Sequence, residues 1–392
     1  MTRLNRRKLV SLVAVFGIAV LGTSGAAFAQ DATPVASPVG GPPMELPPPP
    51  AYAEVVATGL ANPRGIAIGA DGAVYVAEAG VGGDGPCAMG PEGNEECFGL
   101  SGGVTRIAAG TQERIIDGLA SRAAEGGMNA TGPNDVGVVG DTVYVLIGLG
   151  GDPATRVDVN AGANQFGYLF KQENGELTTV ADIAGYETKA NPDGNALDAN
   201  PFGLVVWEDG SALVTDAGMN ALLAVGGDGA ISTWGVFPNE TAKAPDGSEI
   251  PMNAVPTGVV QALDGAALVG QLTGFPFPVG GAKVFMVPSG GGDPTVIQEG
   301  FTNIIDLALG PDGSLYVLEL VAGGLLNADP TNPATLDGQL TRILPDGTRE
   351  VVAKEGLSTP TGLAVDADGN IYVAVFGVLG NMGQVWKIAA AS

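Results

Sequence analysis

The 392-residue sequence contains no histidine, two cysteines and only 17 Lys and Arg residues against 42 Asp and Glu. Without histidine there is no imidazole to act as a general base or metal ligand, which excludes histidine-centred nucleophilic triads. The net charge of −25 repels nucleic acid and anionic membrane surfaces, so we expect neither as a partner. After the N-terminal segment, no stretch reaches the roughly twenty apolar residues of a membrane helix, and we expect no membrane span.

Residues 1–29 have the three parts of a cleavable signal peptide. Basic residues come first, an apolar run over residues 9–21 follows, and Ala27-Phe28-Ala29 supplies small residues at the two positions that signal peptidase reads. The pair Arg6-Arg7 also fits a twin-arginine signal, so both the Sec and the Tat routes stay open. We expect a secreted or periplasmic protein with 13 basic against 42 acidic residues, because the signal holds four of the 17 basic residues and no acid.

The composition changes again after the signal peptide. Residues 30–53 are rich in Ala, Pro and Val and include Pro47-Pro48-Pro49-Pro50, which is typical of an extended linker. Residues 54–392 keep one Gly-rich, alternating texture, which favours a single large domain. Within it, Cys87 and Cys97 predict one structural disulfide in an oxidising compartment, rather than a metal site or a redox pair.

The domain is built from a repeat. Six times the chain shows an apolar strand, a turn that is often Asp-Gly, a second strand often containing Tyr-Val, a third strand after a variable loop, and a polar fourth strand. The clearest copies begin at residues 63, 305 and 360, and weaker copies cover residues 134–146, 201–214 and 256–269. Asp-Gly pairs suit tight hairpins, and six four-stranded units packed face to face predict an all-β, six-bladed β-propeller.

The two ends of the domain predict how the ring closes. The sixth copy stops at Ile388 without a fourth strand, while residues 54–60 resemble residues 350–357, the fourth strand of copy five. We therefore expect the N-terminal strand to complete the last blade, with Val55 beside Trp386. This pairing covers a sheet edge that would otherwise be exposed.

Several motifs resemble one family of exported propellers. They are Asn62-Pro63-Arg64-Gly65, Asn191-Pro192-Asp193-Gly194, Leu272-Thr273-Gly274-Phe275-Pro276-Phe277-Pro278 and Gly300-Phe301-Thr302-Asn303-Ile304-Ile305-Asp306. In these motifs the chain is similar to the ScyD/ScyE family. The resemblance implies a bacterial extracytoplasmic protein related to six-bladed NHL and TolB-like propellers. Some members are linked to assembly of the indolic pigment scytonemin, but most have no assigned chemistry, and the fold alone does not transfer the pigment role. Streptogramin lyases and quinoprotein dehydrogenases have related folds but depend on histidine, which this chain lacks.

Polar residues recur where second strands end and first strands begin, positions that share one end of a propeller channel. Second strands end at Glu78, Asp216, Gln271 and Glu319, and first strands begin near Arg64, Asn134, Asp135, Asn200, Thr257, Asn303 and Asp306. Oxygen ligands of this kind could hold Ca²⁺ or Mg²⁺, with Glu78, Asp216 and Glu319 as the candidate carboxylates, as in gluconolactonase-like propellers. The alternative is that these side chains cap the blade ends and bind loop backbone.

Aromatic residues offer a second candidate site. Phe275 and Phe277 lie in a stiff, Pro-rich loop that could present rings to an apolar or aromatic ligand. Core filling between blades accounts for the same residues equally well.

Three functions follow from these features. The first is an extracytoplasmic binding or scaffold propeller without catalysis, favoured because no catalytic constellation stands out. The second is a divalent-cation-dependent hydrolase or lactonase that uses the channel carboxylates. The third is an accessory factor in extracytoplasmic pigment or envelope chemistry. The sequence does not decide whether the protein is an enzyme. We expect a monomer that binds a small molecule or an envelope protein.

Overall fold

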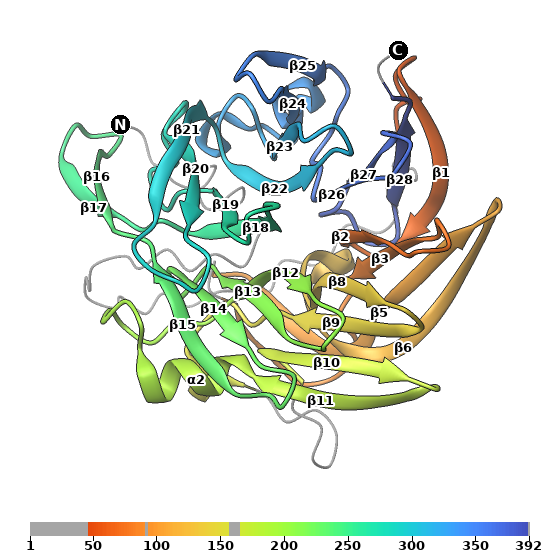
Figure 1. Cartoon of the computed structure of the whole chain (residues 1–392), viewed down its shortest axis with the longest axis horizontal. Helices are drawn as coiled ribbons and strands as arrows, with labels where there is room; N and C mark the ends of the chain where they lie inside the picture. The colour runs from red at the N-terminus through yellow and green to blue at the C-terminus, as the bar shows by residue number, and fades with distance from the viewer. Residues whose placement is uncertain (1–45, 91–92, 157–164, 391–392) are drawn as a thin grey trace, which may run out of the picture.

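Six small β-sheets stand in a ring around a central axis, as the sequence repeat predicts (Figure 1). The structure is a computed structural model that describes residues 46–90, 93–156 and 165–390. The expected signal peptide and most of the expected linker lie outside the described residues. The innermost strands of the six sheets surround the axis, and each sheet radiates outward from its innermost strand. The protein is therefore a six-bladed β-propeller.

Five of the blades follow the chain in order. Blade 1 contains β2 (Pro63–Ile68), β3 (Val74–Glu78), β5 (Glu95–Ala108) and β6 (Thr111–Ala124), with the short strands β4 (Cys87–Met89) and β7 (Met128–Thr131) added. Blade 2 contains β8 (Pro133–Val139), β9 (Thr142–Ile147), β10 (Tyr168–Glu173) and β11 (Glu176–Asp182). Blade 3 contains β12 (Pro201–Val206), β13 (Ala212–Asp216), β14 (Ala221–Val225) and β15 (Ile231–Val236). Blade 4 contains β18 (Pro256–Gln261), β19 (Ala267–Gln271), β20 (Ala282–Val287) and β21 (Thr295–Phe301). Blade 5 contains β22 (Ile304–Leu309), β23 (Leu315–Glu319), β24 (Gln339–Ile343) and β25 (Arg349–Ala353).

Blade 6 joins the two ends of the domain. Its strands are β26 (Gly362–Val365), β27 (Ile371–Val375), β28 (Gly383–Ile388) and, outermost, β1 (Ala53–Leu60). β1 lies beside β28 (Figure 1) and pairs with it antiparallel. Val55 lies opposite Trp386 in this pairing. The predicted ring closure is confirmed. β1 begins one residue before the expected boundary, and Tyr52 packs against the same apolar cluster as Trp386.

Three blades share a clamp at the turn between their first two strands. An Asp accepts hydrogen bonds from the turn, a Tyr follows on the second strand, and a basic residue from the third strand lies over the Tyr ring. The members are Asp71, Tyr75 and Arg106 in blade 1, Asp312, Tyr316 and Arg342 in blade 5, and Asp366, Tyr372 and Lys387 in blade 6. Hydrogen bonds from the Ser314 backbone and hydroxyl, and then from Arg342, lower the pKa of Asp312 to about 2. In blades 1 and 5 the clamp Asp belongs to the Asp-Gly pair of the turn, whereas in blade 6 it lies two residues before that pair.

Blade 1 departs most from the simple repeat. β5 and β6 each run for 14 residues, longer than the strands of the other blades. The predicted disulfide is confirmed, because Cys87 and Cys97 are bonded and pair β4 with the first part of β5. Beneath this extension, Arg122 forms a buried ion pair of 2.6 Å with Glu96. A disulfide in this position fits an extracellular or periplasmic protein.

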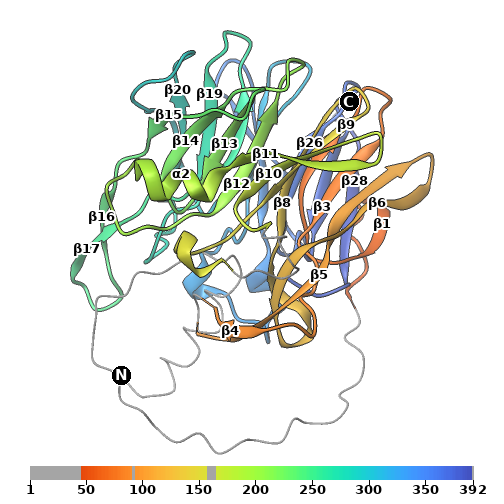
Figure 2. The same cartoon turned by 90° about the horizontal axis from the view of Figure 1, so that it is seen from below.

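The ends of the blades differ in their decoration. One end carries short hairpin turns, and the other carries the helix α2 (Ile183–Ala190), the hairpin β16 (Glu240–Lys243) and β17 (Glu249–Met252), and the strand β4. Short 3-10 turns cover Glu125–Gly127, Pro153–Thr155, Leu325–Asn327 and Pro333–Leu336. In Figure 2, β4 and the β16–β17 hairpin extend from the lower side of the ring. We call the end that carries α2, β4 and the β16–β17 hairpin the loop face. Within the described part of the chain, none of the helices combines the length and apolar character needed to cross a membrane.

Candidate functional site

Glu78 and Glu319, two of the four residues at the ends of second strands, have hydrogen-bond partners on both carboxylate oxygens. The Glu78 carboxylate accepts the Ala61 N–H at 2.7 Å and the Thr105 hydroxyl, and it pairs with Arg114 at 3.1 Å. Glu319 accepts the Thr302 N–H at 2.6 Å and the Gln339 amide at 3.1 Å, and burial raises its pKa to about 7. Both carboxylates therefore fasten the segment that leads into the first strand of their own blade.

The equivalent residues of blades 3 and 4 are less completely bonded. Asp216 accepts three N–H groups with Oδ1, from Asn200 at 2.7 Å and from Gly218 and Met219 at 3.0 Å each. Its Oδ2 is buried and has no hydrogen-bond partner among the described residues. Both polar atoms of the buried Gln271 amide are likewise without a partner among those residues. Buried polar groups of this kind are rare and call for an explanation.

Amides and hydroxyls near the starts of first strands connect neighbouring blades. The Asn134 amide donates to the Pro201 carbonyl at 2.8 Å, and the Thr257 hydroxyl donates to the Ile304 carbonyl at 2.8 Å. A further set of such contacts involves Asn200 with Leu149, Asn303 with Leu272 and Leu325, and Arg64 with Gly377 and Ala130. Burial lowers the pKa of Arg64 to about 10. These residues hold the ring together at its centre.

Asp135 and Asp306 form an acidic pair on the innermost strands. They occupy equivalent positions in blades 2 and 5, which lie opposite each other in a six-membered ring. Burial raises the pKa of both carboxyls, and the charge of Asp306 raises that of Asp135 further. Both keep some exposed surface. Protonation of one of the two carboxyls relieves the charge repulsion on the other.

Each axial carboxyl also binds the blade that follows. Asp135 accepts the Leu204 N–H at 2.7 Å, and Asp306 accepts the Leu363 N–H at 2.8 Å. Glycine in the preceding blade leaves the necessary room, because a Cβ at Gly65 would lie 1.9 Å from Asp135 Oδ1, and one at Gly258 would lie 2.5 Å from Asp306 Oδ1. Each carboxyl thus contacts three consecutive inner strands, and the two together cover the whole ring.

A second acidic group, which sequence reasoning missed, lies beside Asp216. Glu187 is in α2, Asp193 and Asp198 follow in the loop to β12, and Asp152 comes from the loop after β9. Burial raises the pKa of Glu187 to about 7 and that of Asp198 to about 6, with further contributions from the charges of neighbouring acids. Burial also raises the pKa of Asp216 to about 7. The density of acids and amides over residues 191–200 was the available sequence signal.

The three carboxylates expected to share a divalent cation belong to alternate blades. Glu78, Asp216 and Glu319 end the second strands of blades 1, 3 and 5, and each binds the backbone of its own loop. Within the described residues, no three His, Cys, Asp or Glu side chains are grouped as metal ligands. The structure therefore favours the capping role for these positions.

The aromatic loop is mainly part of the core. Phe277 is 3% exposed and packs with Phe202, Val255 and Leu272, whereas Phe275 is half-buried against the same cluster. The two rings meet edge to face, with their centroids 6.2 Å apart. Core filling thus accounts for Phe277, and Phe275 alone keeps part of its ring accessible.

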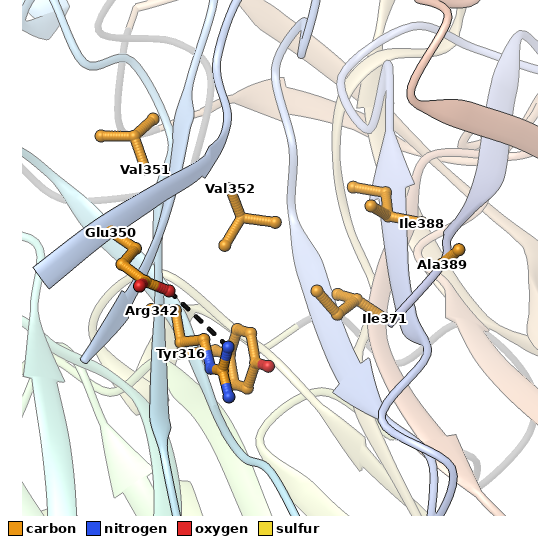
Figure 3. A pocket seen from close by; sticks show the side chains of 8 residues that line it. All are labelled: Tyr316, Arg342, Glu350, Val351, Val352, Ile371, Ile388 and Ala389. Carbon is orange, nitrogen blue, oxygen red and sulfur yellow. Dashed lines mark ion pairs between the residues drawn. The ribbon is translucent and has the colours of Figure 1, made fainter. Parts of the chain in front are cut away.

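A groove of about 270 Å³ lies between blades 5 and 6, away from the predicted residues (Figure 3). Val352 faces Ile371 and Ile388 across it, Val351 lies at its rim with the side chain turned to the other side of β25, and Tyr316, Arg342 and Glu350 form a polar end. Arg342 pairs with Asp312 at 2.5 Å and with Glu350 at 3.6 Å. Val351 is 61% exposed on the outer strand β25. No sequence pattern indicates this groove, because its walls come from different repeats.

Comparisons with known proteins support the fold alone. No family model matches the chain, so the ScyD/ScyE resemblance has no support from that search, and no curated protein matches either. Among solved structures, the PQQ-bound aldose sugar dehydrogenase of Streptomyces coelicolor is 14% identical, with a TM-score of 0.50 over 87% of this chain and 99% of that chain. A putative glucose dehydrogenase of Thermus thermophilus is 14% identical, with a TM-score of 0.49 over 86% and 98% of the two chains. Virginiamycin B lyase of Staphylococcus aureus is 12% identical, with a TM-score of 0.39 over 84% and 96%. At these identities, the chain shares with the first of these a six-bladed propeller fold, and no activity follows from the likeness.

Proposed function

We propose that the protein is an extracytoplasmic binding or scaffold propeller, exported by the signal peptide of residues 1–29 and without a reaction at its axis. The observation that carries this proposal is that polar side chains at the axis and at the blade ends form hydrogen bonds with the main chain. Glu78, Glu319, Asp135 and Asp306 each accept hydrogen bonds from the main chain with at least one oxygen. Such side chains stabilise loops and neighbouring blades.

A hydrolase of this fold needs a carboxylate or amide that can reach the substrate or a metal-bound water. The partners of Glu78 and Glu319 engage both oxygens of each carboxylate. Asp216 has an oxygen without a hydrogen-bond partner among the described residues, but the residue is fully buried and cannot contact a substrate in the channel. These constraints weigh against the hydrolase alternative.

The groove between blades 5 and 6 is the surface that we assign to binding. At about 270 Å³ it is smaller than the roughly 300–1,000 Å³ typical of sites that enclose a whole small ligand. It suits one or two apolar side chains of a protein partner, entering between Val352 and Ile388. The strong negative charge of the chain and the acids Asp312 and Glu350 beside Arg342 favour a partner with basic residues around that apolar contact. We therefore propose a basic envelope protein as the partner that binds in this groove.

Two measurements test the proposal. The purified mature chain is assayed against lactones, esters and phosphotriesters with Ca²⁺, Mg²⁺, Mn²⁺ or Zn²⁺. We expect no turnover above that of the Glu78→Gln variant, and turnover that this substitution abolishes would establish the hydrolase instead.

The binding surface is tested by photocrosslinking in cells of the producing organism. A photoreactive residue replaces Val351 at the rim of the groove or, as the control, Leu263, which is fully exposed in a turn of blade 4. We expect a discrete adduct with one basic protein from position 351 and none from position 263. Equal labelling from both positions, or none from either, contradicts the assignment.

A further inference from the structure

Four buried oxygen atoms on the loop face have no hydrogen-bond partner among the described residues. They are Glu187 Oε2, Asn191 Oδ1, Asp198 Oδ1 and Asp216 Oδ2. All four are acceptors, and three belong to carboxyl groups. Glu187 and Asp216 are both fully buried. A buried carboxylate oxygen without a donor is costly, so four such acceptors in one region indicate that a positive group belongs there.

Contacts between the segments show that these residues form one group. The Asp198 N–H donates to Glu187 Oε1 at 3.3 Å, which joins the loop to α2. Asp216 Oδ1 accepts from Asn200 and Gly218, which joins the loop to the turn after β13. That turn is pressed against the loop, because a Cβ at Gly218 would lie 2.7 Å from the Asp198 carbonyl carbon.

Charge is not balanced within this group. None of the ion pairs found between described residues includes Glu187, Asp193, Asp198 or Asp216. The neighbouring charges that act on Glu187, Asp198 and Asp216 are those of other acids, including Asp152 and Asp193. Elsewhere in the protein, the buried Glu96 has its Arg122. Unlike Glu96, the buried acids near α2 have no basic side chain among their ion-pair partners in the described residues.

We propose that this region binds one calcium ion through carboxylate and amide oxygens from α2, the loop of residues 191–200 and the end of β13. Calcium takes six to eight oxygen ligands in irregular geometry, and it accepts amide and backbone carbonyl oxygens and water beside carboxylates. No three acids of the described chain stand at ligand spacing, so carboxylates alone do not complete the site, and amide oxygens, backbone carbonyl oxygens and water would supply the remaining ligands. The absence of histidine from the chain and of free cysteine from its described part leaves oxygen as the donor, which favours calcium over zinc or copper.

The ion would fasten three separate segments of the loop face. It places Asp216 in one site with residues of α2 and the following loop, and not with Glu78 and Glu319. This inference goes beyond the proposed binding function and does not depend on the groove, which lies between other blades.

Calorimetric titration of the mature chain, first freed of metal with a chelator, tests the site. We expect one Ca²⁺ to bind at or below about 1 mM, the range of extracellular calcium modules, and Mg²⁺ to bind more weakly. Asp198→Asn and Asp216→Asn are expected to weaken Ca²⁺ binding about tenfold or more. Asp141→Asn, in an exposed turn of blade 2, is the matched control and should bind as the unmodified chain does.

Circular dichroism establishes that each variant is folded before it is titrated. If the Asn variants do not fold, hydrogen exchange of the unmodified chain decides, because calcium should slow exchange over residues 183–200 and leave blade 5 unchanged. Absence of Ca²⁺ binding by the unmodified chain overturns the proposal. Equal affinity in folded Asn variants, or exchange that calcium does not slow, overturns it as well.

Discussion

Ring closure predicts an energetic coupling between two residues at opposite ends of the domain. Val55 in β1 lies directly opposite Trp386 in β28, and Trp386 is 1% exposed, with its ring centroid 5.8 Å from that of Phe376. Removing a buried aromatic side chain costs about 3–5 kcal/mol, so Trp386→Ala should lower the free energy of unfolding by that amount. Val55→Ala removes a half-buried side chain and should cost about 1 kcal/mol.

The double variant separates closure from ordinary core packing. Residues in contact usually couple by about 0.5–3 kcal/mol, so the double variant should lose measurably less stability than the two single losses together. Urea unfolding followed by fluorescence and circular dichroism measures all four proteins, and coincident transitions justify the two-state treatment. Val55→Ala combined with Trp234→Ala in blade 3 is the control and should be additive. Additivity of the Val55 and Trp386 substitutions would refute the pairing of the two ends in solution.

Three further predictions concern the axis and blade 1. The raised pKa of Asp135 and Asp306 means that the folded state binds more protons than the unfolded state at mildly acidic pH. The free energy of unfolding should therefore fall as pH rises from about 4 through the raised pKa values. A urea midpoint that increases over this pH range contradicts the assignment. Gly258→Ala should cost about 1–3 kcal/mol because its Cβ meets Asp306, whereas Gly323→Ala, with no atom within 4 Å, should be nearly neutral; equal thermal shifts in the two variants would show that the Gly258 contact can relax. Reduction of the Cys87–Cys97 disulfide should lower the free energy of unfolding by at most about 3 kcal/mol and leave the other blades intact. Hydrogen exchange of the backbone amides measures this effect. Loss of amide protection in all six blades would mean that blade 1 is essential to ring closure.

The sequence predicts the fold well because the repeat carries its own turn chemistry. The Tyr-Val strands recur in the clamp of blades 1, 5 and 6, where a basic side chain from the third strand lies over the Tyr ring. In blades 1 and 5 the clamp Asp is also the Asp of the Asp-Gly turn. Closure by β1 could be predicted from the sequence because residues 54–60 resemble a fourth strand that the sixth copy lacks. The long β5–β6 ribbon could not be predicted, since no local pattern distinguishes a strand that ends from one that continues over a disulfide-bonded extension.

The candidate site was less predictable, for a geometric reason. The repeat indicates which polar residues end the second strands, Glu78, Asp216, Gln271 and Glu319, but it does not say where their side chains turn. The carboxylates turn to the N–H groups of their own loops, which lie at hydrogen-bond distance. The acids of α2 and the following loop belong to no repeat, so comparison of repeats could not find them. Contact between α2, the loop and β13 appears only in three dimensions.

The shared sixth blade sets an order for biogenesis. β1 is among the first parts of the domain to be synthesised, yet its partner β28 is among the last, so the strand has no native neighbour until nearly the whole chain exists. Blades 1 to 5 can form their hydrogen bonds from contiguous sequence, whereas the final seam cannot. A product that stops short of residue 383 would keep five complete sheets but leave both β1 and β27 with open edges. Such a chain offers sites for aggregation and proteolysis, and the seam thereby distinguishes finished from unfinished molecules.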